Sequence, residues 1–340
     1  MNAFRAAAGL PEVALDAKLS AGCARHADYL LRNAGSEAIA GLLAHQEQAN
    51  LPGASRDGAD CGKNADIFQG VADLDVAVDG FMAGIYHRRP VLDPGLSTIG
   101  IGTKQLPDGT YILVLRLSAG QKSEGWPIAY PADHQTKVPL EYGNEIPNPV
   151  PGGGPAGYPV TLQFPPFDKV TRVRARLADS RGHEVPIHLS DPEHPATSFP
   201  QSGVVSLIPQ QRLVAGATYT ASVTATWQGK QRSWKWSFQT LELRAIDAAD
   251  RKAVGEALGV PSRVRGTVTH GGHIPGHVFL QLGKGDPMVS VIIPDEVWGQ
   301  RGDPAKLAGK TVEVESSPQL VDHKFLNLPI ATAGQLRVVK

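Results

Sequence analysis

The sequence predicts a multidomain protein in which an α+β domain precedes two small all-β domains. Its 340 residues are more than one hydrophobic core usually contains. Two stretches divide the chain, a Pro/Gly-rich linker at residues 123–157 and a helical connector at 244–260. Helical periodicity dominates before the first stretch, and short alternating apolar runs follow it. We therefore expect domains at 1–122, 158–243 and 261–340.

The first segment predicts helices followed by strands. Apolar residues recur at helical spacing over residues 15–30, behind the candidate cap Asp16, and again over 73–84. From residue 99 to 117 the apolar residues follow a strand pattern on either side of a Pro-Asp-Gly turn, which is typical of a hairpin with a buried second strand. Helices followed by strands in one segment predict an α+β sandwich.

This segment also carries several motifs in a specific order. They are Asn2-x-x-Arg5-x-x-x-Gly9-Leu10, Cys23-x-x-His26-x-x-Tyr29-Leu30-x-x-Asn33, Ala77-Val78-Asp79-Gly80-Phe81-Met82 leading to Tyr86-His87-Arg88, Asp93-Pro94, and Ile99-Gly100-Ile101-Gly102. The order resembles bacterial CAP domains, the fold of cysteine-rich secretory and pathogenesis-related proteins, over residues 1 to about 120. The resemblance implies an α-β-α sandwich in a protein that is extracellular or periplasmic.

The resemblance also implies a ligand cleft. In the CAP family two histidines and two acidic residues line a cleft that binds a divalent metal such as zinc in some members. His45 and His87 look like the two histidines, and Glu47 is the acidic residue that we expect beside them. Lys63 and Gly84 stand where the family has its acidic residues. A metal site at His45 and His87 would therefore be weak, since catalytic zinc usually has three protein ligands.

Other carboxylates could replace the missing acidic ligands. The intervening loop offers Glu47, Asp57, Asp60 and Asp66. His26 lies on the apolar face of its helix, so we expect a hydrogen-bonded core histidine. Cys23 and Cys61 form either one disulfide bridge or two reduced, buried thiols.

The middle segment predicts a β-sandwich. Its clearest unit is a hairpin at residues 219–238, in which apolar residues alternate on both sides of a Gln228-Gly229 turn. The approach Leu213-x-x-Gly216-x-x-Tyr219 resembles bacterial immunoglobulin-like domains. That resemblance implies a role in spacing or adhesion.

The last segment predicts a small β-barrel. The expected elements are strands at 264–268, 277–282 and 289–293, a short helix near 304–307, and strands at 311–315 and 335–339. This is the order of an OB-fold, and the phrase from Leu307 to Val312 resembles that fold. His270, His273 and His277 have a spacing suited to a metal, but glycines surround them, so we expect a solvated loop.

Composition excludes some classes of partner. The 33 basic and 33 acidic residues give a net charge of +0, which disfavours binding to nucleic acid or to an anionic membrane. No apolar run approaches the roughly 18 residues of a membrane-spanning helix. Residues 1–5 lack the apolar core of a signal peptide.

Three functional classes follow from these patterns. We favour a secreted, non-enzymatic binding protein whose CAP cleft holds a small molecule, lipid, glycan or protein ligand. The first alternative is a metal-dependent hydrolase or peptidase that uses the same cleft. The second is oligonucleotide binding by the OB-like segment, for which few aromatic residues are available.

Overall fold

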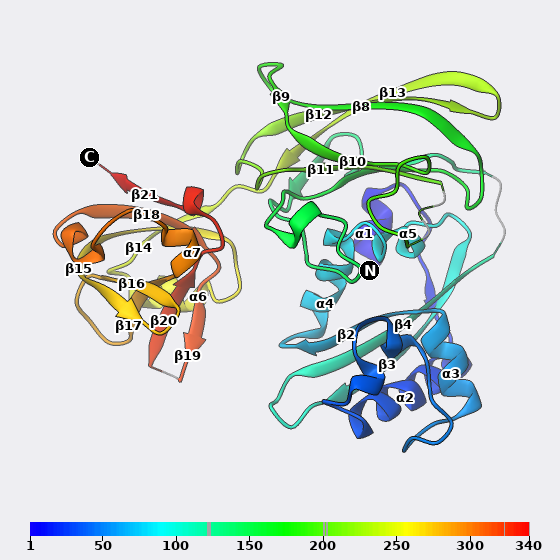
Figure 1. The fold of residues 1–340 in the computed structure, drawn as a ribbon, viewed down its shortest axis with the longest axis horizontal. Helices are drawn as coiled ribbons and strands as arrows, with labels where there is room; N and C mark the ends of the chain where they lie inside the picture. The colour runs from blue at the N-terminus through cyan, green and yellow to red at the C-terminus, as the bar shows by residue number, and fades with distance from the viewer. Residues whose placement is uncertain (121–123, 200, 202, 323, 340) are drawn as a thin grey trace. The chain divides into compact units, whose positions relative to one another are not determined.

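The structure is a computed structural model that describes residues 1–120, 124–199, 201, 203–322 and 324–339. The chain forms two compact units, Met1–Leu241 and Glu242–Lys340 (Figure 1). Each unit has its own sheets, and each is described by itself.

The first unit begins with a sheet that carries helices on both faces (Figure 1). Its elements are α1 (Asn2–Ala7), β1 (Ala14–Leu15), α2 (Ala17–Arg32), η1 (Glu37–Ile39), η2 (Gly41–His45), α3 (Arg56–Lys63), β2 (Ala65–Val71), α4 (Leu74–Ala83), α5 (Arg88–Val91), β3 (Leu96–Gln105) and β4 (Tyr111–Ala119). The strand order is β1-β3-β4-β2, in which only the β1–β3 pair is parallel. On one face α2 packs against β3 and β4, and on the other the ring of Phe68 in β2 lies 6.0 Å from that of Phe81 in α4.

The predicted helices and hairpin of this segment are confirmed, and their ends follow from capping. Asp16 accepts a hydrogen bond from the Leu19 amide (2.8 Å) and begins α2. Asp73 accepts one from the Asp75 amide (2.9 Å) and begins α4. Strands β3 and β4 pair as an antiparallel hairpin.

Two glycines let α2 lie close to the sheet. A Cβ atom at Gly102 would lie 2.2 Å from the Cys23 carbonyl, and one at Gly100 would lie 2.6 Å from the Leu19 carbonyl carbon. Real Cβ atoms do not approach backbone so closely, so the Gly-x-Gly pattern of the motif sets the distance between helix and strand.

A disulfide joins α2 to α3. Cys23 and Cys61 are bridged with a Cα–Cα distance of 5.2 Å, and both side chains are buried. Of the two alternatives that the sequence left open, a disulfide or two reduced thiols, the structure contains the disulfide. Because it spans a sequence separation of 38 residues, it contributes about 4 kcal/mol in the chain-entropy model.

The rest of the first unit consists of two β-sheets. The strands are β5 (Ile128–Tyr130), β6 (Gln135–Val138), β7 (Val160–Gln163), β8 (Val170–Asp179), β9 (Glu184–Val185), β10 (Ile187–Ser190), β11 (Val204–Pro209), β12 (Thr218–Trp227) and β13 (Lys230–Thr240), with a short 3-10 helix, η3 (Pro151–Gly153). One sheet has the order β10-β11-β7-β5 and the other the order β6-β13-β12-β8-β9. Figure 1 shows the two sheets as stacked layers.

The alternating hairpin predicted in this region is β12 and β13. Trp227 pairs with Lys230 across the Gln228-Gly229 turn. The apolar side chains of β12 are buried at every second position, as the period of two requires. The ring of Phe164, just after β7, lies 5.2 Å from Trp227 and 5.3 Å from Trp234, so aromatic contacts join the two sheets.

Of the segment expected to be a linker, residues 123–157, the described part (124–157) belongs to this fold. Strand β5 pairs with β7, and β6 pairs with β13 in parallel. The expectation of a simple linker is therefore wrong, because prolines and glycines here shape short edge strands and turns instead of an unstructured connection.

A buried arginine fastens the β-sheets to the N-terminal helices. The guanidinium of Arg88, 1% exposed, lies 5.1 Å from the ring centre of Tyr130 and 4.8 Å from that of Tyr158. It donates to the carbonyls of Met82 (2.8 Å) and Pro159 (2.7 Å). Residues far apart in sequence are thus held around one cation.

Strands are the main secondary structure of the second unit. Its elements are β14 (Arg244–Asp247), α6 (Arg251–Glu256), β15 (Ser262–Ile274), β16 (His277–Leu282), β17 (Met288–Pro294), α7 (Asp295–Trp298), η4 (Pro304–Leu307), β18 (Thr311–Ser316), β19 (Gln319–Val321), β20 (Phe325–Pro329), η5 (Ala333–Gln335) and β21 (Leu336–Val339). The expected strands and short helix are present, and β14, β19 and β20 are additional. In the part of the chain that the structure describes, no helix is long and apolar enough to span a bilayer.

The predicted connector at 244–260 belongs to this second unit. Strand β14 pairs in parallel with β15. Ile246 and Val254 lie in the same hydrophobic cluster as Val264 and Leu280. The connector is therefore packed against a core, and the boundary between the units lies at Leu241.

We predict that residues 1–241 fold alone. A chain ended after Leu241 should keep one cooperative melting transition, because the boundary leaves the sheets of the first unit complete. A chain ended at residue 258 should aggregate more readily, since it exposes Ile246 and Val254 without their core partners. Calorimetry and light scattering of both truncated chains test this, and a broad, non-cooperative melt of residues 1–241 would contradict it.

Candidate functional site

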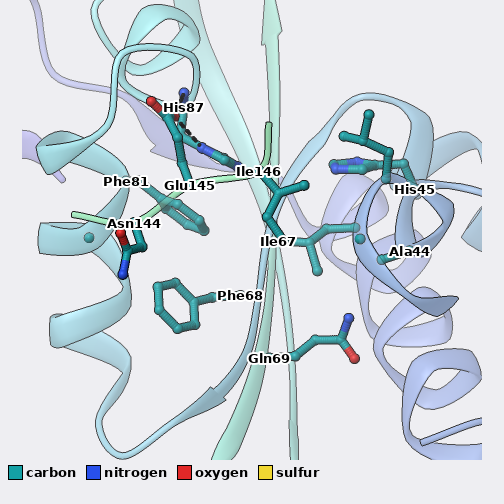
Figure 2. A pocket seen from close by; sticks show the side chains of 13 residues that line it. Ala44, His45, Ile67, Phe68, Gln69, Phe81, His87, Asn144, Glu145 and Ile146 are labelled. Carbon is teal, nitrogen blue, oxygen red and sulfur yellow. Dashed lines mark hydrogen bonds and ion pairs between the residues drawn. The ribbon is translucent and has the colours of Figure 1, made fainter. Parts of the chain in front are cut away.

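His45 and His87 line the same two neighbouring cavities in the first unit. The smaller has a volume of about 220 Å³ and is walled by η2, β2, α4 and residues 144–146 (Figure 2). The larger, of about 500 Å³, extends from the two histidines towards Phe199 of the β-sheet region. In Figure 2 the side chain of Ile146 lies between the two imidazoles, and it lines both cavities.

Glu145 organises the turn that carries His87. Its carboxylate accepts hydrogen bonds from the amides of Ile85 (2.6 Å) and Tyr86 (3.0 Å). It also accepts one from His87 Nδ1 at 2.9 Å (Figure 2). The carboxylate is 2% exposed, so these bonds are shielded from water. The second ring nitrogen of His87, Nε2, is left free of this pairing.

Glu145 occupies the position that the resemblance assigned to a lost acidic residue. A Cβ atom at Gly84 would lie 2.4 Å from Glu145 Oε2. A larger residue at 84 would therefore collide with the carboxylate that the later segment inserts. Gly143 also lets the later segment lie close to the end of α4. Its amide donates to the Ala83 carbonyl (3.1 Å), and a Cβ atom at 143 would lie 2.9 Å from the Ala83 side chain.

Sequence reasoning missed Glu145, since it lies outside the CAP-like segment. One sequence signal was available. Gly84 stands where the family has an acidic residue, which allows an acidic residue from a later segment to take its place. That signal does not specify which downstream acid returns to the cleft. Only the packing of the β-sheet region decides it.

His45 is held by a backbone carbonyl. Its Nδ1 lies 3.0 Å from the Gly62 carbonyl oxygen, which can only accept, so Nδ1 carries the hydrogen. In the neutral ring Nε2 is then an unprotonated acceptor. Burial is the main cause that lowers the pKa of His45, and the charges of His87 and His26 lower it further against the opposing effect of the Gly62 bond.

His87 has the opposite tendency. Burial opposes its protonation, but the hydrogen bond to Glu145 and the charges of Asp66 and Glu145 outweigh burial and raise the pKa of the ring. The ring also stacks on Phe81 with a centroid distance of 5.4 Å. The site therefore presents a neutral imidazole beside one that favours the charged form.

Asp66 is the second acidic group of the site. It lines the larger cavity and is 8% exposed, and its Oδ2 has no hydrogen-bond partner among the described residues. Burial raises the pKa of Asp66 to about 7, with Glu145 adding to the rise and His87 opposing it. The protonated carboxyl is thus well populated at neutral pH.

Glu47, which we expected in the cleft, lines neither cavity. It is 2% exposed and lies 2.9 Å from His26 Nδ1. Its other oxygen accepts from the Ser55 amide (2.6 Å). Glu47 therefore belongs to a buried network that supports the fold, and His26 is the hydrogen-bonded core histidine that the sequence predicts.

The other predicted carboxylates of the loop lie outside the cleft. Asp57 pairs with Arg25 at 2.8 Å, and Asp60 pairs with Arg116. Lys63, which stands where the resemblance expects an acid, lines the larger cavity. In the second unit, His270, His273 and His277 lie on the β15–β16 hairpin, so the loop expected there is a pair of strands.

The arrangement does not fit a zinc site. Across the described residues, no three His, Cys, Asp or Glu side chains are grouped so that they could hold a metal ion. Zinc sites use three or four protein ligands. Both oxygens of Glu145 already accept hydrogen bonds, and Lys63 brings a positive charge to the larger cavity, which the two histidines also line.

Comparison with known families agrees with the fold of the N-terminal part. Residues 1–117 match the family model described as "CAP: Cysteine-rich secretory protein family". The chain thus has a CAP domain at its N-terminus. The match ends before Glu145, and no curated protein matches the chain.

Solved structures give only remote likenesses. CopC from Methylosinus trichosporium OB3b is 14% identical with a TM-score of 0.23, over 34% of this chain and 89% of that one. A putative aspartyl-tRNA synthetase from Leishmania major Friedlin is 15% identical with a TM-score of 0.21, over 29% and 21%. An L,D-transpeptidase from Mycobacterium smegmatis is 13% identical with a TM-score of 0.17, over 62% and 96%. These TM-scores carry no argument about fold or function.

We predict that Glu145→Gln lowers the pKa of His87. Loss of the carboxylate removes a buried opposite charge, which typically shifts a pKa by about 1–3 units, and weakens the bonds to the Ile85 and Tyr86 amides. NMR titration of the histidine rings measures the shift. The exposed Glu12→Gln is the matched control. An unchanged His87 titration would show that Glu145 does not control this ring.

We predict that Asp66→Asn changes the pH dependence of stability. The pKa of Asp66 is raised from 3.8 to about 7, so wild-type stability falls as pH rises between these values. Below about pH 4 Asp66 is protonated in both the folded and the unfolded protein. Above about pH 7 the loss of folding stability is complete, at about 4 kcal/mol. The asparagine variant should gain stability relative to wild type from pH 4 to pH 8. Urea unfolding at pH 4, 6 and 8 measures this, and parallel profiles would contradict it.

Proposed function

We propose that the chain is a secreted binding protein whose CAP cleft holds a small ligand without metal chemistry. The main support is that both carboxylate oxygens of Glu145 already accept hydrogen bonds from the Ile85–His87 turn. The cleft then offers two imidazoles, a few charged groups and apolar walls, and the residues that the structure describes form no group of three ligands for an ion. Cavities of about 300–1,000 Å³ with a few polar groups are typical of small-molecule sites.

Two features support secretion. The CAP family is described as one of secretory proteins, and the match covers the domain that contains the cleft. The Cys23–Cys61 bridge is of the kind that persists in oxidising compartments.

The β-structure has a supporting role in this proposal. Pro166 and Phe199, from the β-sheet region of the first unit, line the larger cavity beside His45 and His87. We propose that residues 158–243 are immunoglobulin-like, supported by their two stacked antiparallel sheets. We propose that 261–340 is OB-like, supported by the order of β15 to β17, η4 and β18.

A neutral fluorescent probe tests the binding function. N-phenyl-1-naphthylamine should bind the first unit saturably at one site, with increased fluorescence. Ala119→Phe adds bulk at the edge of the larger cavity and should weaken binding at least tenfold. Gln231→Phe, on an exposed position of β13, is the matched control and should bind like wild type. Equal binding by all three proteins would contradict a cleft ligand.

Zinc binding distinguishes the proposed binding protein from the hydrolase alternative, which requires a bound ion. We expect less than one equivalent of zinc after dialysis, because Lys63 and Gly84 replace the acidic residues and Glu145 is already engaged. Elemental analysis and zinc titration of wild type and His87→Ala measure this. Stoichiometric zinc that is lost in His87→Ala, with zinc-dependent hydrolysis of p-nitrophenyl acetate, would favour the enzyme.

A further inference from the structure

The larger cavity combines cations with apolar walls. Lys63 and Arg89 lie on its lining, as do the apolar surfaces of Tyr86, Leu117 and Phe199. Neither cation forms an ion pair within the described part of the chain. Tyr86 and Phe199 pack edge to face, with ring centroids 5.0 Å apart, so the wall is formed by both the CAP domain and the β-sheet region.

Arg89 gives the first indication of a missing anion. Its side chain is partly buried, and burial lowers its pKa against the opposing charge of Asp93. Asp93 offsets the charge of Arg89 only in part, because the two form no ion pair among the described residues and the charge of Asp93 also interacts with Arg5. A partly buried guanidinium without a paired anion is unfavourable, so an anionic group beside it would be stabilised.

Asp66 gives a second, independent indication. Its Oδ2 is buried without a hydrogen-bond partner among the described side chains, on the same cavity wall. Buried polar atoms are nearly always paired in folded proteins. A protonated Asp66 has a hydrogen to donate, and a ligand oxygen would satisfy it.

Two other acidic groups lie at or near the cavity. Asp93 lines it, and its charge interacts with those of Arg5 and Arg89. Glu145 is compensated by His87 and by the Ile85 and Tyr86 amides. With Asp66 protonated, the lining carries the two positive charges of Lys63 and Arg89 against the single negative charge of Asp93, so its net charge is positive. The remaining wall is apolar and suits a hydrocarbon chain.

We propose that the larger cavity binds a single-chain anionic amphiphile. Its acidic headgroup, a carboxylate or a phosphate, lies at Lys63, Arg89 and Asp66. Its hydrocarbon chain lies along Tyr86, Leu117 and Phe199. This inference rests on the proposed binding function and specifies the ligand class of the same site.

Four ten-carbon probes test the headgroup. Decanoate, decyl phosphate, decan-1-ol and decyltrimethylammonium are titrated, below their micelle concentrations, against the bound N-phenyl-1-naphthylamine. The two anions should displace the dye at concentrations at least tenfold lower than the alcohol, and the ammonium should be weaker than the alcohol. Decanoate and decyl phosphate then distinguish a carboxylate from a phosphate headgroup.

Charge reversal tests the residue assignment. Lys63→Glu should weaken both anions at least tenfold and leave decan-1-ol unchanged, because Lys63 is exposed and its change affects charge more than packing. Lys18→Glu, an exposed lysine outside both cavities, is the matched control and should bind all four probes like wild type.

The outcomes separate this inference from the proposed function. If wild type binds the dye but shows no preference for the anions, the amphiphile inference is overturned and the binding function stands. The same holds if Lys63→Glu keeps the anion preference. If neither the dye nor any ten-carbon probe binds saturably, the binding function fails and this inference fails with it.

Discussion

The geometry of the candidate site depends on one buried carboxylate. Glu145 binds three consecutive residues after α4 through the Ile85 and Tyr86 amides and His87 Nδ1. Backbone amides in a turn have no helix or strand partner, and a carboxylate that accepts from them forms charge-assisted hydrogen bonds that hold the turn strongly. The orientation of His87 therefore depends on a residue beyond the end of the family match at residue 117.

The carboxylate reaches this position because the chain returns to the CAP domain. Strands β5 and β6 attach the returning segment to both sheets of the β-sheet region. Arg88, next to His87, is enclosed by Tyr130 and Tyr158 and donates to the Pro159 carbonyl. Removing the later segment would thus expose a buried cation and the amides of the turn together, which makes the CAP domain and the β-sheets one structural unit.

The opposite wall of the cleft is rigid for a different reason. His45 is bonded to the Gly62 carbonyl, and Gly62 follows the bridged Cys61. His26 fills the space over Gly62, where a Cβ would lie 2.4 Å from its ring, and bonds to the Ala44 carbonyl (2.8 Å). The two histidines are therefore held by independent networks, one covalent and local, the other assembled from distant segments. Burial lowers the pKa of His45, whereas the hydrogen bond to Glu145 and the charges of Asp66 and Glu145 raise that of His87.

The sequence by itself determined the local elements and the family of the first third. Capping by Asp16 and Asp73, the Gly100-x-Gly102 strand and the period-two hairpin β12–β13 depend on residues close in the chain, so patterns predict them. His45 and His87 were identified from motifs for the same reason, and both line the cleft.

Only the tertiary structure decided which acids face the histidines. Glu47 was expected because it is two residues from His45, yet its carboxylate is buried against His26. Glu145 was missed because 58 residues separate it from His87. The bridging of Cys23 to Cys61 and the role of residues 123–157 were settled in the same way. Side-chain neighbours across such separations depend on how sheets and helices pack, and no local periodicity encodes that packing.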